Sequence, residues 1–448
     1  MKFGGTSLGS AERIRAAVTR VREQLPRKPV VVVSALAKVT DLLIRGAHAA
    51  LERDARTDAL AQEVRDRHQA LIAELFPAGK DRLFARVNAL TDELRGFYTG
   101  VHYLRELTPR TLDAIAGLGE RLSAPIFAAA LQVKGIEAEA LDSRPLIITD
   151  ESFGRAVPLL EETAGRVRST LPPLIERGSV PVVPGFVGGT RTEVATTLGR
   201  GGSDWSASLI GAALDAEEIQ IWTDVDGLMT VDPRVVPGAR AIGETSFDEA
   251  AELAYFGAKV LHPATIKPAV ERGIPVRILN SLNPEAHGTR IAGRPEGDHG
   301  EPRAIAFKKG ITVVFISQPR MLMAYGFVAR VFDVFDRHRT PVDLIATSEV
   351  SISLTVDDAT RLPEMRDELE QLGEVHVLAG MAIVSVVGHG FNRQPGLAAR
   401  VFDALREVNV VMISFGASDV NISFVVAEGD AEAAVKLLHR AFFEKVPA

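Results

Sequence analysis

Apolar, β-branched runs alternate with longer stretches of helical spacing through roughly the first 280 residues. The strand-like runs are 30–34 (VVVVS), 180–183 (VPVV), 218–223 (EIQIWT) and 275–279 (PVRIL). Helical spacing covers 11–24, 41–74, 83–107, 111–133, 159–177, 203–214 and 247–261. This alternation predicts an α/β fold in which a mostly parallel sheet lies between helices. In such sheets ligands bind on the loops that follow the carboxyl ends of the strands.

The pattern changes from 283 to 310, where Pro, Gly and mixed charge show no sustained period. We therefore predict a linker at 286–310, which follows a first domain at 1–285.

An internal repeat follows the predicted linker. Residues 326–356 superpose on residues 396–426 at a constant offset of 70, with 11 identities in 31 positions. In the first copy the predicted elements are 312–316, 326–338, 342–347 and 350–356. This order suits two βαββαβ, ferredoxin-like modules, at 311–380 and 381–448. The repeat alone leaves open whether the modules bind a ligand or are purely structural.

Composition narrows the functional classes. The 448 residues are enough for two to four domains, and the net charge is 51 − 58 = −7 without a basic block, so no nucleic acid partner is expected. The absence of cysteine removes disulfides, thiolate metal sites and cysteine nucleophiles, and fits a cytoplasmic protein. No apolar signal core opens the sequence and no run approaches ~18 apolar residues, so no membrane partner is expected.

The opening segment KFGGTS places Lys2 at the end of a predicted strand and Gly4 and Gly5 in the turn that follows. Glycines there let backbone amides approach an anion, and the next helix start adds partial positive charge. The lysine precedes the glycines, so this is not a Walker A loop. A plain strand-to-helix turn remains an equal alternative.

A second glycine-rich turn, TTLGRGGSD, carries Arg200, Ser203 and Asp204 ahead of a predicted helix. A guanidinium and a carboxylate among glycines suit recognition of a zwitterion or a phosphate. The alternative is that Ser203 or Asp204 only caps the helix.

The segment WTDVDGLMTVDPR follows a predicted strand and does not have the spacing of a calcium loop. Thr223 and Asp224 would meet the base or ribose of a nucleotide, and Arg234 would meet phosphate; a solvated turn is the alternative. In FGAKVLHP, Lys259 is either a phosphate contact or a surface lysine. Zinc, nucleophile-elbow and dinucleotide motifs are missing from the sequence, so phosphoryl transfer is favoured.

Over essentially its whole length the chain resembles the aspartate kinase family of the monofunctional, amino-acid-regulated kind. The motifs that carry the resemblance are KFGGTS, VSA with Thr40 six residues after Ser34, GER at 119–121, TTLGRGGSD, WTDVDG with DPR, FGAKVLHP and TSEVS, in the family's order. The resemblance implies an amino-acid-kinase fold for 1–285, followed by two regulatory ACT modules.

The implied reaction transfers the γ-phosphoryl group of ATP, with Mg²⁺, to the side-chain carboxylate of L-aspartate. The products are 4-phospho-L-aspartate and ADP, in the first step toward lysine, threonine, methionine and diaminopimelate. Two alternatives stay open: a sibling kinase that acts on glutamate or N-acetylglutamate, and a non-catalytic lysine-binding sensor.

The resemblance also implies roles for individual residues. Catalysis is implied for Lys2 and Asp204, and aspartate binding for Ser34, Thr40, Glu120, Arg200 and Ser203. ATP binding is implied for Lys2, Gly4, Gly5, Thr223, Asp224, Met229, Arg234 and Lys259. No protein side chain is expected to ligate the metal. The chemistry agrees, because an aspartate carboxylate with a pKa of ~3.9 is ionised at neutral pH and needs no general base.

A lysine effector is expected in the first module, at Met321, Gly326, Phe327, Val328, Val342, Asp343, Thr347, Ser348 and Glu349. A carboxylate such as Asp343 or Glu349 can pair with the effector's ammonium group. The resemblance also implies a homodimer that pairs through the ACT modules.

The chain departs from the family's pattern at three places. Only Met1 precedes Lys2, so either the first strand is unusually short or the true start lies upstream. Met229 stands where a tyrosine is common in the nucleotide loop, and Ala324 replaces a hydroxyl residue that is common in lysine-sensing members.

Overall fold

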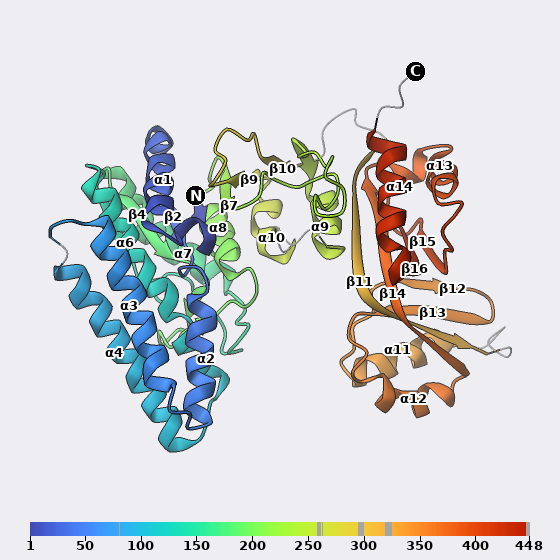
Figure 1. The fold of residues 1–448 in the computed structure, drawn as a ribbon, viewed down its shortest axis with the longest axis horizontal. Coiled ribbons are helices and arrows are strands. Elements are labelled where there is room, and N and C mark those ends of the chain that lie inside the picture. The colour runs from blue at the N-terminus through green and yellow to red at the C-terminus, as the bar shows by residue number, and fades with distance from the viewer. Residues whose placement is uncertain (80, 258–260, 262, 294–299, 319–324, 445–448) are drawn as a thin grey trace. The chain divides into compact units, whose positions relative to one another are not determined.

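The computed structural model describes residues 1–448 except 80, 258–260, 262, 294–299, 319–324 and 445–448 (Figure 1). The chain divides into two compact units, Met1–Leu228 with Val260–Gly293, and Met229–Lys259 with Arg294–Ala448. Within the predicted first domain, 1–285, residues 229–259 therefore group with the C-terminal part of the chain.

A mostly parallel sheet forms the centre of the first unit. Its strands are β1 (Lys2–Phe3), β2 (Val31–Val33), β3 (Ala138–Ala140), β4 (Val180–Pro184), β7 (Ile219–Thr223), β9 (Val276–Asn280) and β10 (Thr289–Ala292). They lie in the order β3-β4-β2-β1-β7-β9-β10, and all neighbours are parallel except β9 and β10. The four strands predicted from apolar runs are confirmed. A separate hairpin joins β5 (Val187–Gly189) to β6 (Ala195–Thr197).

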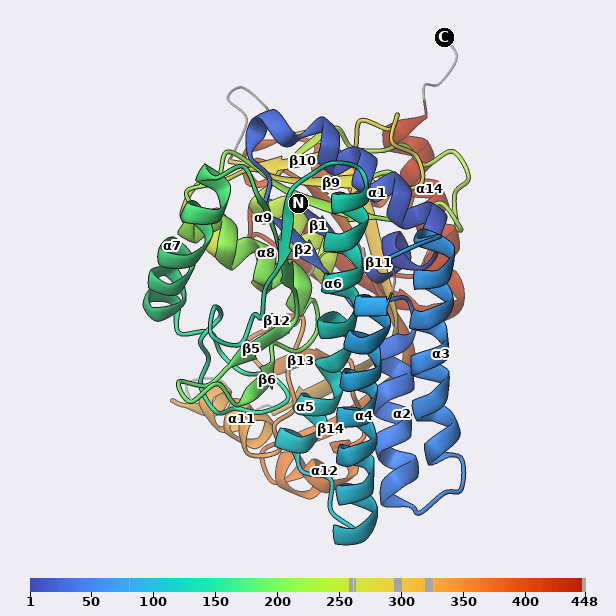
Figure 2. The same cartoon turned by 90° about the vertical axis from the view of Figure 1, so that its left-hand side faces the viewer.

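Helices cover both faces of this sheet (Figure 2). They are α1 (Ala11–Glu23), α2 (Val39–Leu51), α3 (Thr57–Leu75), α4 (Asp81–Leu104), α5 (Pro109–Ala116), α6 (Leu118–Val133), α7 (Leu160–Glu176), α8 (Gly202–Ala213) and α10 (Pro263–Glu271). Alternation along β2 explains the two layers: Val31 and Val33 join the core under α1 and α6, while Val32 lies on the side of α8.

Two long predicted helices are each broken. The helix predicted at 41–74 is α2 and α3, because Arg53 adopts a left-handed conformation (φ 58°) and the Asp54 carboxylate accepts a hydrogen bond from the Arg56 amide at 2.8 Å. The helix predicted at 111–133 is α5 and α6, which meet at Gly117. A Cβ there would lie 3.0 Å from a Val187 methyl group, so a larger residue would need Val187 on β5 to shift.

The stretch Pro109–Val133 is long and apolar enough, by length and composition alone, to cross a membrane. However, 78% of its most apolar window is buried inside the protein, as in a core helix.

The second unit contains a six-stranded antiparallel sheet in the order β12-β13-β11-β14-β16-β15. Its strands are β11 (Pro302–Ser317), β12 (Ile345–Thr347), β13 (Ser351–Val356), β14 (Glu374–Gly388), β15 (Met412–Phe415) and β16 (Asn421–Ala427). Its helices are α9 (Phe247–Tyr255), α11 (Phe327–Arg337), α12 (Leu362–Glu370), α13 (Leu397–Ala404) and α14 (Ala431–Phe443), and β8 (Glu244–Ser246) precedes α9. The predicted repeat is visible in the elements: α11 and β13 begin 70 residues before α13 and β16.

The helix predicted at 247–261 is shorter than expected, because α9 ends at Tyr255. Gly257 has φ 137°, and a Cβ there would lie 2.5 Å from the Phe307 carbonyl oxygen. The backbone therefore turns at a position that only glycine fits.

The two modules share their longest strands, which corrects the predicted linker and the tandem boundaries. Residues 311–317 of β11 pair with β13 and with residues 374–381 of β14, whereas residues 302–309 pair with residues 382–388 of β14. The first half of β11 thus supplies the fourth strand of the second module, and the first module is inserted into the second. Residues 286–310 are not a linker, because they contain β10 and the start of β11.

The shared strand makes a testable prediction about stability. Ile305 is 2% exposed in the core formed with Phe424 and Leu438, so Ile305→Ala should lower the free energy of unfolding by about 2–5 kcal/mol. Leu378→Ala is the matched control, since Leu378 is 40% exposed on β14. Chemical denaturation of both variants checks this, and equal losses would contradict the assignment of residues 302–309 to the second module.

Candidate active site

A cavity of about 410 Å³ opens in the first unit at the carboxyl ends of β1 and β2. Residues predicted to bind or transform the substrate line it together: Lys2, Gly5, Ser34, Thr40, Glu120, Arg200, Ser203 and Asp204. They come from segments up to 200 residues apart, and the parallel sheet brings these segments to one edge.

Lys2 lies at the base of this cavity. Its ammonium forms an ion pair with Asp204 Oδ1 at 2.7 Å, and the two side chains are 11% and 12% exposed. Although β1 has only two residues, it is held between β2 and β7, and the Gly4 amide donates to the Trp222 carbonyl oxygen at 3.1 Å. A Cβ on Gly4 would lie 3.5 Å from the Lys2 ammonium, so the turn leaves the cation open to an anionic ligand.

Glu120 is the most buried acid of the cavity. It is 3% exposed in the first turn of α6, and burial raises the pKa of its carboxyl to about 8 against the smaller effects of the Ala35 amide and Lys2. Its Oε2 is buried and has no hydrogen-bond partner among the described residues. A buried, unpartnered carboxylate oxygen on a cavity wall suits a ligand that brings a cationic donor.

The glycine-rich loop turns into α8 at the cavity wall. Gly199 and Gly201 have φ values of 74° and 72°, which other residues rarely adopt, and Gly202 begins the helix. The amino end of α8 therefore borders the cavity with its unpaired amides and partial positive charge. Arg200 is exposed there and makes no ion pair within the part of the chain that the structure describes.

Asp113 anchors the strand that precedes this loop. Its carboxylate accepts hydrogen bonds from the Thr197 hydroxyl at 2.6 Å, the Thr197 amide at 3.0 Å and the Gly154 amide at 2.8 Å. It is 3% exposed, and burial raises its pKa against these three bonds. This contact fixes the end of β6, three residues before Arg200.

Sequence reasoning missed several residues of the site. Lys38, Asp41 and Phe186 line the cavity, and Asp113 holds its loop. Lys38 precedes α2 in a left-handed conformation (φ 65°) and is exposed. Its position between Ser34 and Thr40, both predicted, was the one available signal.

The predicted nucleotide residues are divided between the two units. Thr223 ends β7, and its carbonyl oxygen accepts hydrogen bonds from the Ser281 amide at 2.8 Å and hydroxyl at 2.9 Å. Its own hydroxyl donates to the exposed Asp224 at 3.3 Å. Thr223 and Asp224 therefore follow the strand beside β1, at the same edge of the sheet as the cavity.

The other nucleotide residues belong to the second unit. Met229 forms an isolated bridge with Ala241, and Arg234 is paired with Asp232 at 2.6 Å with its guanidinium side chain 88% exposed. Lys259 lies outside the described residues.

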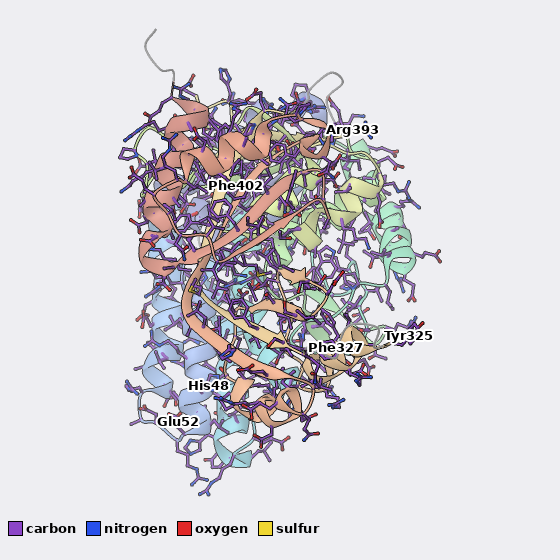
Figure 3. All side chains as sticks on the ribbon, turned by 90° about the vertical axis from the view of Figure 1, so that its right-hand side faces the viewer. His48, Glu52, Tyr325, Phe327, Arg393 and Phe402 are labelled. Atoms are coloured by element: carbon purple, nitrogen blue, oxygen red, sulfur yellow. The ribbon has the colours of Figure 1, made fainter. Side chains whose placement is uncertain are left out.

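The predicted effector residues lie in the first module. Gly326 precedes α11, Phe327 is buried in the module core against which Val342 packs, and Val328 is 42% exposed. Thr347 ends β12, and the exposed residues Ser348 and Glu349 follow in the turn to β13. Asp343 precedes β12, and Met321 lies outside the described residues. Tyr325, beside Gly326, is 99% exposed and points into solvent (Figure 3).

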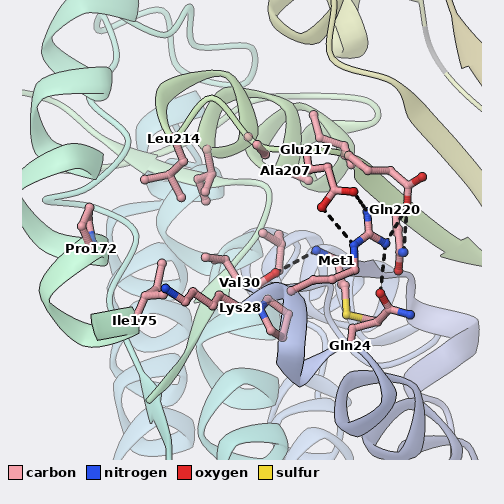
Figure 4. Close-up of a pocket in the computed structure, with 18 of the residues that line it drawn as sticks. Met1, Gln24, Lys28, Val30, Pro172, Ile175, Ala207, Leu214, Glu217 and Gln220 are labelled. Carbon is pink, nitrogen blue, oxygen red and sulfur yellow. Dashed lines mark hydrogen bonds and ion pairs between the residues drawn. The ribbon is translucent and has the colours of Figure 1, made fainter. Parts of the chain in front are cut away.

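A second cavity of the first unit, about 400 Å³, lies at the amino ends of the strands (Figure 4). The Met1 ammonium donates to the Val30 carbonyl oxygen at 2.8 Å there, and Arg27 lies between Gln24 and Glu217. None of the predicted site residues lines it, so the chemistry belongs to the opposite end of the sheet.

The comparisons with known proteins agree with this geometry. Residues 1–280 match the amino acid kinase family, and residues 384–442 match an ACT domain. The fold is therefore that of an amino acid kinase joined to ACT modules.

Similar proteins show which family of amino acid kinases the chain belongs to. The chain is 39% identical to aspartokinase 2, chloroplastic, of Arabidopsis thaliana, in a match that covers 100% of this chain and 84% of the relative. It is 36% identical to lysine-sensitive aspartokinase 3 of Escherichia coli, in a match that covers 99% of this chain and 98% of the relative. The structure of E. coli aspartokinase III with aspartate and ADP is 35% identical, with a TM-score of 0.86 and 99% of each chain covered. The same enzyme with lysine and aspartate gives a TM-score of 0.79 at the same coverage. The chain belongs to the aspartokinase family.

The anchoring role of Asp113 is testable by Asp113→Asn. The two backbone N–H groups donate to the same carboxylate oxygen, and a neutral amide oxygen accepts them more weakly, so the loop should loosen and KM for L-aspartate should rise about tenfold, while KM for ATP changes less. Steady-state kinetics check this. Asp150→Asn is the control, because Asp150 also accepts from two loop amides, those of Ser152 and Val157, without a bond to β6. Equal effects of the two substitutions would contradict the anchoring role.

Proposed function

We propose that the chain phosphorylates the side-chain carboxylate of L-aspartate with ATP, forming 4-phospho-L-aspartate and ADP, and that lysine inhibits it. The observation that carries the proposal is the single cavity in which Lys2, Glu120 and Arg200 converge. Among the charged residues of this cavity, Glu120 matches the ammonium of aspartate, and the Arg200 and Lys2 cations match its carboxylates and the phosphoryl group.

Each end of aspartate has a partner in the cavity. The buried, unpartnered oxygen of Glu120 would accept the ammonium group, and the guanidinium of Arg200 would bind the α-carboxylate in a bidentate manner. Hydroxyl groups would complete the contacts, from Ser34, Thr40 and Ser203. This leaves the side-chain carboxylate free to approach Lys2.

The chemical step depends on bringing two anions together. The carboxylate nucleophile is already ionised, so the main task is electrostatic. Lys2 would stabilise the transferring phosphoryl group, with Asp204 holding the ammonium in place, and the amides at the start of α8 would add positive potential. An acyl phosphate hydrolyses readily, so water must be excluded during transfer.

On the first unit, the nucleotide would be held by Gly4, Gly5, Thr223 and Asp224. Among the described residues there is no group of three or more acids or histidines that could hold a metal ion. We propose that Mg²⁺ arrives on the ATP phosphates, where it would supply charge neutralisation.

We further propose a cytoplasmic homodimer that pairs through the ACT modules. Exposed apolar side chains on the edge strands support this assembly, since Ile345 on β12 and Ile413 and Phe415 on β15 are each 41–45% exposed.

Purified protein with ATP, Mg²⁺ and L-aspartate should form an acyl phosphate, which hydroxylamine traps as a hydroxamate. Lys2→Met should lower kcat by about 10²- to 10³-fold, because the cation at the phosphoryl group is lost. Lys134→Met, on the exposed end of α6, is the matched control. Turnover with glutamate or N-acetylglutamate but not with aspartate would contradict the substrate, and lysine binding without any turnover would indicate a non-catalytic sensor.

The raised pKa of Glu120 predicts a pH dependence. Below about pH 8 the empty site holds a neutral Glu120, whereas pairing with the aspartate ammonium needs the carboxylate, so KM for aspartate should fall as pH rises from about 6.5 to 8.5. Because the folded-state pKa lies above the usual ~4.3, this group also removes stability from the unliganded protein as pH rises from about 4 to 8.

Glu120→Gln tests the assignment. It should raise KM for aspartate about 10- to 100-fold and flatten its pH profile, since the variant has no ionisable group there. A variant profile with the wild-type slope would assign the titration to another residue.

A further inference from the structure

Four charged or polar side chains meet in the second unit, around the acid expected to bind the effector. The Tyr255 hydroxyl, at the end of α9, donates a hydrogen bond to Asp343 Oδ1. The Lys308 ammonium, on β11, lies 4.0 Å from the same oxygen, bonds to Asp357 and stands 4.8 Å from the centre of the Tyr255 ring.

The Asp343 side chain is 3% exposed. Its Oδ2 is buried and has no hydrogen-bond partner in the described part of the chain. Burial raises the pKa of Asp343, with Asp357 adding to the effect and Tyr255 and Lys308 opposing it. A carboxylate with one oxygen held by the chain and the other left without a donor is incompletely satisfied.

The charges of this cluster do not balance. Two carboxylates, Asp343 and Asp357, face a single ammonium, so the cluster has a net charge of −1 when both are ionised. It can accept one further cation. Moreover, Lys308 presents the same group as the proposed effector, a primary ammonium on a four-carbon chain, to the same carboxylate.

We propose that Lys308 acts as an internal competitor of the effector, so that Lys308 and Tyr255 set the affinity of the first module for lysine. This inference rests on the proposed function, in which Asp343 pairs with the effector's ammonium. In the described state the chain's own ammonium and hydroxyl hold Asp343. An incoming ammonium takes the unpartnered Oδ2 and weakens the hold of Lys308 and Tyr255 on Oδ1.

Competition of this kind predicts the direction in which each substitution changes the affinity for lysine. Removing the Lys308 charge makes the cluster more negative and frees Asp343, so an external amine should bind more tightly. Removing the Tyr255 hydroxyl should act in the same direction, since Asp343 loses its internal donor. If Lys308 were instead a direct partner of the effector, its loss would weaken binding.

The experiment is a calorimetric titration of the purified full chain with L-lysine at about pH 8, where Asp343 stays ionised. Lys308→Met should lower the dissociation constant about three- to tenfold, and Lys308→Arg should restore a value near wild type. Lys309→Met is the matched control: Lys309 follows on the same strand but pairs with Glu432 at 2.8 Å, so its loss should leave the dissociation constant unchanged.

L-Norleucine, which has the four-carbon side chain and the α-ammonium of lysine but lacks the side-chain ammonium, should show no tightening in Lys308→Met. Unchanged or weaker lysine binding by that variant, or a gain shared with norleucine, would overturn the proposal. If circular dichroism shows that Lys308→Met does not fold, the same binding comparison between lysine and norleucine is made with Tyr255→Phe.

The hydroxamate assay separates this inference from the proposed function. Aspartate turnover without any lysine binding would overturn the inference and leave the kinase assignment standing. If lysine binding tightens in Lys308→Met but the protein does not turn over aspartate, the inference stands and the kinase assignment is overturned.

Discussion

The ion pair between Lys2 and Asp204 joins a two-residue strand to the first turn of α8, and the arrangement of the active site depends on it. Both side chains are nearly buried, so either charge left alone would cost several kcal/mol. Asp204 therefore holds the ammonium in β1, where, in the proposed reaction, an incoming phosphoryl group would find it already oriented. Because β1 lies between β2 and β7, neighbouring strands position this cation and the strand itself needs little length.

Close backbone approach is the second requirement of the site, and it explains several glycines that carry no chemistry themselves. A Cβ on Gly119 would lie 2.6 Å from the Ala35 methyl group, and one on Gly185 would lie 2.8 Å from Ser203 Cβ. These contacts press α6 and α8 against the loops that follow β2 and β4. Glu120 and Ser203 reach the same cavity because their neighbours have no side chains to separate the elements.

The alternation of strands and helices predicted the α/β fold class, and the predicted residues Lys2, Glu120 and Arg200 line one cavity. Lys2 lies in β1, Glu120 in the first turn of α6 and Arg200 just before α8, so their meeting at one edge of the parallel sheet follows from its topology. Other features depend on tertiary partners that no local pattern records. Examples are the break at Gly117, which faces β5, and the anchoring of β6 by Asp113, which lies 84 residues away from Thr197. The segment 302–309 was interpreted as a linker because its alternation is short, although Ile305 and Phe307 belong to a core completed by the second module.

The pairing of β11 with both modules has a consequence for regulation. Lys308 and Lys309 are neighbours on β11, and successive side chains of a strand point to opposite faces. Lys308 reaches Asp357 in the first module, whereas Lys309 reaches Glu432 on α14 in the second. Gly310, with φ 78°, follows them where the strand passes from one module to the other. A ligand that displaces Lys308 therefore acts on a strand that is also a structural part of the second module. The two modules are coupled through covalent backbone and a shared ladder of hydrogen bonds, and no separate linker has to transmit the change.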